Sequence, residues 1–131
     1  MSYDVFFWRE EPDAKLDPER VLRELEDTVV LPGVVSLPLD TVKPAFKQQF
    51  PDISDDGSSL EWEGDDSYFQ VSFTFLDERT VSMTTVCCGY SLLKNPTAMQ
   101  RLRAVASALG CRFFDPHKPA EKPSLFKRLF G

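Results

Sequence analysis

Residues 60–88 read LEWEGDDSYFQVSFTFLDERTVSMTTVCC. Apolar and polar side chains alternate along most of this stretch, and turn residues interrupt the alternation at 64–67 and again at 76–78. A period of two, with many aromatic and β-branched residues, is typical of strands that bury one face. We therefore predict a central three-strand antiparallel meander over residues 60–88. Its buried positions are expected to be Leu60, Trp62, Phe69, Val71, Phe73, Phe75, Val81, Met83, Thr85 and Cys87, with Cys88 near the surface.

The main elements on either side of the meander follow from similar patterns. Residues 3–8 are apolar on both faces, as in an interior strand that is covered on two sides. Each of the sequences Asp-Pro at 17–18 and Asn-Pro at 95–96 combines a helix N-cap with a first-turn proline. The apolar spacing that follows these signals predicts two main helices, over about 18–28 and about 96–109.

Weaker patterns predict the remaining elements. Asp40 or Thr41 can cap a short helix in which Pro44 occupies the tolerated first turn. The segment 111–114 is short and apolar, as expected of a last strand. Residues 124–130 are expected to form one or two helical turns.

These elements together predict an α+β fold in a single domain over residues 1–131. The sheet is expected to be mainly antiparallel, with about five strands, the first strand in its middle and the two main helices on one face. Residues 118–131 are expected to form a tail with a short C-terminal helix.

Length and composition limit the class of protein. A chain of 131 residues with 42% hydrophobic residues can bury the core of one domain without disulfides. No apolar run reaches the roughly 20 residues of a spanning helix, which argues against stable membrane insertion. The start MSYD lacks the basic and apolar regions of a secretory signal. Together with three cysteines that form no disulfide framework, this predicts a cytoplasmic location.

Charge is unevenly distributed along the chain. Residues 48–78 contain nine acids and no Lys or Arg, whereas residues 79–131 contain nine bases and two acids. An acidic surface repels nucleic acid and speeds the encounter with basic proteins. We therefore predict a basic protein partner and no nucleic acid, although such acids can also serve only to keep an aromatic sheet soluble. The predicted contact residues are seven acids and two aromatic anchors: Asp52, Asp55, Asp56, Glu61, Glu63, Asp65, Asp66, Trp62 and Tyr68.

Few residues could carry chemistry. One histidine and no Cys-x-x-Cys pair argue against a zinc site, and the chain has no glycine-rich phosphate loop. Nucleophilic catalysis by Cys111 would need a base beside it, but His117, the single imidazole, lies beyond Pro116 in an expected turn. The acidic pairs within residues 61–66 are expected to face water, where both members stay ionised. We therefore predict no catalytic residue, no metal and no cofactor, with a small enzyme of unrecognised carboxylate chemistry as one alternative.

Two motifs lie near the ends of the predicted sheet. Residues 1–8 read MSYDVFFW, and residues 108–116 read ALGCRFFDP. The chain resembles a loose group of small bacterial proteins in which a SYD-aromatic-W first strand and an LG-x-x-aromatic-DP last strand bracket a helix-and-sheet domain. Several of these proteins resemble immunity proteins, the cytoplasmic inhibitors that protect a bacterium from its own secreted toxin. The resemblance implies no catalytic residue.

We therefore expect a non-enzymatic, acidic protein-binding module, and the resemblance implies an immunity protein whose partner is a toxin domain. The other alternative is a secretion-system or housekeeping adaptor that uses its basic C-terminal helix to contact a membrane or an assembly. The oligomeric state is left open, since an exposed edge strand could pair across a twofold axis but nothing requires it.

Overall fold

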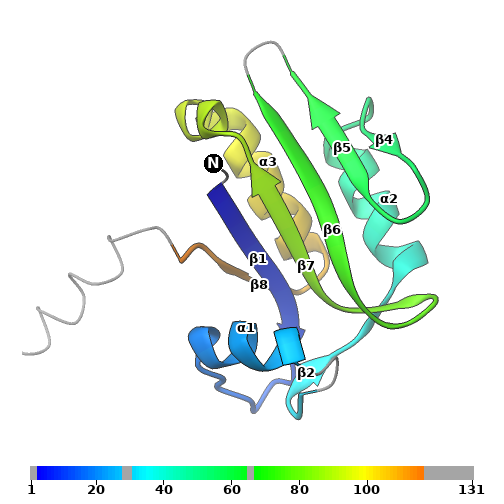
Figure 1. Cartoon of the computed structure of the whole chain (residues 1–131), viewed down its shortest axis with the longest axis vertical. Helices are drawn as coiled ribbons and strands as arrows, with labels where there is room; N and C mark the ends of the chain where they lie inside the picture. Colours follow the sequence, from blue (N-terminus) through cyan, green and yellow to red (C-terminus); the bar gives the residue numbers. More distant parts are fainter. Residues whose placement is uncertain (1–2, 28–30, 65–66, 117–131) are drawn as a thin grey trace, which may run out of the picture.

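The computed structural model describes residues 3–27, 31–64 and 67–116 (Figure 1). These residues form an α+β fold with a mostly antiparallel open sheet and three α-helices, which confirms the predicted fold class. The strand order is β2-β1-β7-β6-β5-β4, with β3 paired to β7 and β8 paired to β1. In chain order the elements are β1 (Tyr3–Glu10), α1 (Pro18–Asp27), β2 (Val34–Val35), β3 (Leu37–Pro38), α2 (Leu39–Gln49), β4 (Ser54–Asp55), β5 (Leu60–Glu63), β6 (Tyr68–Asp77), β7 (Thr80–Cys88), the 3-10 helix η1 (Tyr90–Lys94), α3 (Pro96–Ala108) and β8 (Arg112–Phe114).

The predicted meander is present as β5, β6 and β7. β6 pairs antiparallel with both neighbours, so that Leu60, Val71 and Val86 lie opposite one another across the three strands. All three side chains are fully buried. The two main helices also agree with prediction, because α1 and α3 begin at the expected prolines, Pro18 and Pro96.

The third strand of the meander departs from the predicted alternation at Ser82. Between the register pairs Phe75–Val81 and Thr74–Met83, the chain advances one residue on β6 but two on β7. Such a β-bulge reverses the faces of all later side chains in the strand. The expectation for the adjacent cysteines was therefore wrong: Cys88 lies in the main core, and Cys87 lies half-buried on the opposite face.

β1 lies inside the sheet, as predicted. Its first five residues pair with β7, and Phe6, Phe7 and Trp8 also pair with β8 along the other edge. Beyond Phe7 the strands β1 and β7 separate. The end of β1 then pairs with β2, and the start of β7 pairs with β3.

Helices cover both faces of the sheet, although the two main helices were expected to pack on one face. α2 and α3 cover the face that carries Val5 and Phe7, where the main core lies. α1 packs through Val21 and Leu25 against Trp8, on the opposite face of β1. In Figure 1, α2 and α3 lie behind the sheet and α1 lies at its lower end. Because β1 has large apolar side chains on both faces, each face requires a cover.

The sheet has eight strands within the described residues, rather than about five. The additional strands are β2, β3 and β4, each of two residues. These strands are defined only by their hydrogen bonds to longer strands. A strand of two residues is too short to show an alternating pattern, so the sequence does not predict it.

α2 begins earlier than predicted. Its N-cap is Pro38 and makes no side-chain capping bond, while the Leu39 N–H donates to the Arg79 carbonyl oxygen (2.7 Å). The hairpin between β6 and β7 thus supplies the acceptor for an N–H group at the start of the helix, which was the role expected of Asp40 or Thr41. Pro44 consequently lies inside the helix, where its missing N–H removes one helical hydrogen bond.

The predicted tail and C-terminal helix at 118–131 lie outside the described residues, as does His117. Within the described part of the chain, no helix is long and apolar enough to cross a membrane.

Candidate functional site

Part of one sheet face is not covered by any helix of the described residues. On the face opposite the main core, α1 covers the region around Phe6, Trp8 and Met83. Beyond that region Glu61, Glu63, Tyr68 and Ser72 are exposed, and their neighbours are half-buried. We call this surface the open face; it consists of Asp4, Glu61, Glu63, Tyr68, Gln70, Ser72, Thr85 and Cys87.

The strand registers order the open face into rows. One row runs across four strands and contains Asp4, Cys87, Gln70 and Glu61. The first three of these residues were not predicted as members of a site. Asp4 reaches the row only through the pairing of β1 with the distant β7, and Cys87 faces it only because of the bulge at Ser82. Gln70 pairs with Glu61 in the predicted β5–β6 hairpin and could have been included from alternation alone. The polar character of Gln70 at an alternate strand position was the available signal.

Tyr68 and Glu63 form the adjacent row. They are direct register partners on β6 and β5, and both are exposed. Tyr68 has 40% of its surface exposed and is one of two large hydrophobic side chains that are exposed in the described residues. Partial desolvation raises the pKa of Tyr68, and the nearby Glu61, Cys87 and Glu63 raise it further. The charges of the two carboxylates therefore act on the hydroxyl group of Tyr68, which agrees with their positions on the same face.

Asp4 and Cys87 face each other at the inner end of the first row. Burial raises the pKa of the Cys87 thiol to about 11, and a hydrogen bond with Asp4 and the charge of Asp4 contribute to this shift. The Oδ1 atom of Asp4 is buried and has no hydrogen-bond partner within the described structure. A thiol with such a pKa stays protonated at neutral pH, so Cys87 is unsuited to act as a nucleophile.

Trp62 belongs to the core rather than to the open face. It is 7% exposed, and its ring packs 5.1 Å from Phe50 and 5.4 Å from Phe69, measured between centroids. Its indole N–H donates to the Asp52 carboxylate (3.1 Å). The buried ring cannot contact a partner, so we exclude Trp62 from the candidate site, and Asp52 serves to hold it in place.

Asp55 lies at the edge next to α2, away from the open face. Its carboxylate pairs with Lys43 (3.0 Å) and Lys47 (3.4 Å), one helical turn apart on α2. A hydrogen bond from the Gly57 N–H and the bond from Lys43 hold the pKa of Asp55 below its ordinary value. The two lysines precede the base-free window, so the predicted one-signed charge of residues 48–78 is partly neutralised by the fold.

The carboxylate of Asp56 accepts hydrogen bonds within its own turn. Its Oδ1 atom accepts hydrogen bonds from the N–H groups of Ser58 (3.0 Å) and Ser59 (2.7 Å), and these bonds lower the pKa of Asp56. The structure therefore divides the predicted acids. Glu61 and Glu63 lie together on the open face, Asp52, Asp55 and Asp56 make contacts within the molecule, and Asp65 and Asp66 lie outside the described residues.

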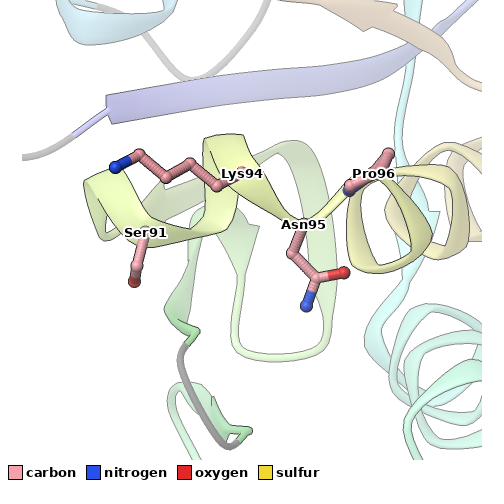
Figure 2. Close-up of a pocket in the computed structure, with 4 residues that line it drawn as sticks. All are labelled: Ser91, Lys94, Asn95 and Pro96. Carbon is pink, nitrogen blue, oxygen red and sulfur yellow. The ribbon is translucent and has the colours of Figure 1, made fainter.

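A hollow of about 400 Å³ lies at the start of α3 and is lined by Ser91, Lys94, Asn95 and Pro96 (Figure 2). The Asn95 side chain is already engaged, since it accepts from the Ala98 N–H (3.1 Å) and donates to Ser67 (3.0 Å). Ser91 and Lys94 extend on opposite sides of the backbone in Figure 2. The polar groups therefore do not converge on one point in the hollow.

The remaining candidate nucleophile, Cys111, is half-buried beside the main core. Burial raises its pKa to about 12, which keeps the thiol protonated. Its proposed base, His117, is outside the described residues. Another buried polar contact ties the two ends of the fold together: the Tyr3 hydroxyl donates to the Asp115 carboxylate, and both residues are buried.

Among the described residues, no group of three or more His, Cys, Asp or Glu side chains could hold a metal ion. No protein-family model, curated protein or solved structure matches the chain.

Proposed function

We propose that the chain is a non-enzymatic protein-binding module that holds a basic partner against its open face. In its specific form, the proposal is a cytoplasmic immunity protein that neutralises a bacterial toxin, as the resemblance of the two end motifs implies. The observation that carries the proposal is the exposure of Glu61, Glu63 and Tyr68 side by side on a sheet face that no described helix covers.

The charges on this face are available to a partner. Neither Glu61 nor Glu63 takes part in an ion pair with any other described residue, in contrast to Asp55. Exposed carboxylates that lack an internal partner can steer a basic protein toward the face and fix its orientation. Tyr68 supplies the apolar contact area that such charges lack, and aromatic side chains dominate the energetics of many interfaces.

The first experiment identifies the partner and tests inhibition. The full-length protein is used to capture binding proteins from an extract of the organism that encodes it, and each captured protein is then purified. We expect one captured protein to be toxic when it is expressed alone and harmless when it is co-expressed with this chain. Capture without any change in the toxicity or activity of the bound protein would contradict an immunity function.

Association rates test the assigned face. Reversing two charges with Glu61→Lys and Glu63→Lys should slow association with the identified partner by about tenfold or more at low ionic strength. The matched control is Glu11→Lys with Asp13→Lys, which changes the net charge equally at two exposed residues outside the open face. Equal slowing by both double variants would show that net charge, rather than this face, governs the encounter.

A further inference from the structure

We propose that the open face recognises its partner through an arginine side chain that stacks on the Tyr68 ring and pairs with Glu63 and Glu61. This inference rests on the proposed function and adds the chemistry of the group that the partner presents.

The register gives the geometry of the recognition group. Tyr68 lies directly opposite Glu63, and Glu61 lies two residues earlier on the same strand and the same face. Directly opposed side chains have Cβ atoms about 5 Å apart, and diagonal neighbours about 7 Å apart. A guanidinium group above the ring can therefore reach one carboxylate directly and the second through its other N–H groups.

Charge complementarity favours a cation at this position. Glu61 and Glu63 place two negative charges next to the exposed aromatic side chain of Tyr68, and the open face as defined contains no Lys or Arg. The cation–ring contacts of the described residues involve Arg101 and Arg103, which lie over Phe50, Trp62 and Phe113. Tyr68 has no such contact with any described residue, so its exposed ring is available to a basic group of a partner.

Arginine fits the group better than lysine does. A guanidinium is planar, presents N–H groups that match a carboxylate in pairs, and stacks on an aromatic ring while it does so. An ammonium group can make the charge contact but lacks the fork and the flat face. The acids at 52, 55 and 56 offer no equivalent position, because their carboxylates already bind groups within the molecule.

The test uses two capped peptides, Gly-Arg-Gly-Arg-Gly and Gly-Lys-Gly-Lys-Gly, titrated into the full chain and followed by backbone amide NMR. We expect the arginine peptide to shift the signals of Glu61, Glu63 and Tyr68, with an affinity about two- to fivefold higher than that of the lysine peptide. With Tyr68→Leu this preference should disappear, whereas the control Asp56→Asn should retain it. Equal affinity of both peptides for the unaltered chain, or larger shifts at residues 52–56, would overturn the proposal.

Binding measurements with the identified partner distinguish this inference from the proposed function. Tyr68→Leu and Glu63→Gln should each weaken partner binding by about tenfold or more, as expected for central interface residues. If the partner is inhibited but both variants bind it as tightly as the unaltered chain, the function stands and the arginine contact is wrong.

Two other occupants of the face would also overturn the inference. A second copy would appear as concentration-dependent self-association in sedimentation experiments that Tyr68→Leu abolishes. The chain's own basic end would be indicated if Lys127→Gln with Arg128→Gln shifted the Tyr68 signal in the free protein. We expect neither change.

Discussion

At Asp4 and Cys87, two side chains meet on neighbouring strands, and Asp4 influences the ionisation of the Cys87 thiol. Burial is the largest cause of the raised pKa of Cys87, and Asp4 contributes through a hydrogen bond and its charge. Asp4→Asn removes the charge, so the pKa of Cys87 should fall and its thiolate fraction at about pH 8 should rise, at most about tenfold per pKa unit.

The rate of iodoacetamide labelling, located by peptide mass spectrometry, measures this change. We expect labelling of Cys87 to become about two- to tenfold faster in Asp4→Asn. Cys111 provides the internal control, because burial is the largest cause of its raised pKa and Asp4 does not contribute. Equal acceleration at both cysteines would indicate a general loosening of the fold instead.

Arg101 stabilises the contact between two helices and the sheet. Its Nε atom donates to the Gln49 carbonyl oxygen (2.8 Å), and its guanidinium lies 4.1 Å from the Phe50 ring centroid. Arg101→Ala should lower the free energy of unfolding by about 2 to 3 kcal/mol, since a charge-assisted hydrogen bond and a cation–ring contact are lost together.

Arg103 offers a matched comparison on the same helix. It lies 4.4 Å from the Phe113 ring centroid and is exposed. Arg103→Ala should therefore cost only about 0.5 to 1 kcal/mol in urea denaturation. A similar loss for both variants would refute the special role of the carbonyl contact of Arg101.

At the scale of elements, Asn95 joins the start of α3 to the turn before β6. Its side chain caps the helix at the Ala98 N–H and donates to Ser67. Asn95→Ala should cost about 1 to 2 kcal/mol, because the cap and the second hydrogen bond are both lost. Asn95→Asp keeps the capping oxygen and should lose less. Thermal unfolding monitored by circular dichroism ranks the two variants, and equal losses would mean that the cap contributes little.

Asp55 connects β4 to α2 and makes the stability of that connection depend on pH. Its pKa is lowered in the folded protein, so its contribution is fully present above the ordinary carboxyl pKa of about 4 and is lost as the pH falls through the lower folded value. Asp55→Asn should therefore be less stable than the unaltered chain at neutral pH, and this difference should vanish in strong acid. Urea denaturation over this pH range measures the difference. A stability difference that stays constant down to the lowest pH would contradict a lowered pKa for Asp55 in the folded protein.

At the scale of the whole molecule, the two sheet faces have cores of different size. The main core lies under α2 and α3, and a smaller cluster joins Val21 and Leu25 of α1 to Trp8. Leu25→Ala and Leu102→Ala each remove a buried leucine and should each cost about 2 to 5 kcal/mol.

Native-state hydrogen exchange should separate these two variants. In Leu102→Ala we expect faster exchange throughout β5, β6 and β7, because these strands share the main core. In Leu25→Ala the amides of α1 should exchange fastest and the amides of β6 should change less. Uniform acceleration in Leu25→Ala would show that both cores unfold as one unit.

Patterns local in sequence predicted much of this fold. The alternation at Leu60, Val71 and neighbouring positions gave the meander, and the prolines at 18 and 96 gave the helix starts. Three features were not predicted: the two-residue strands, the bulge at Ser82 and the sheet face on which α1 packs. Each depends on contacts between segments that local patterns do not describe.

The same distinction applies to the candidate site. Glu61, Glu63 and Tyr68 were assigned to one exposed face from alternation alone, and their positions agree with that assignment. The same alternation placed Trp62 on the buried side of the meander, and the side chain is indeed buried. This burial conflicts with the predicted role of Trp62 as an anchor for a partner. The neutralisation of Asp55 by Lys43 required the packing of α2 beside β4, which no local pattern contains.

The pairing of β1 bears on how the protein is made. β1 carries Phe6, Phe7 and Trp8, and it leaves the ribosome well before the register partners of these residues, which lie at 84–85 and 112–114. Most of the chain must therefore be synthesised before this strand can enter the sheet, and its aromatic side chains stay exposed during that interval. Nascent chains of this protein should consequently depend on a chaperone that shields aromatic segments until β7 has emerged.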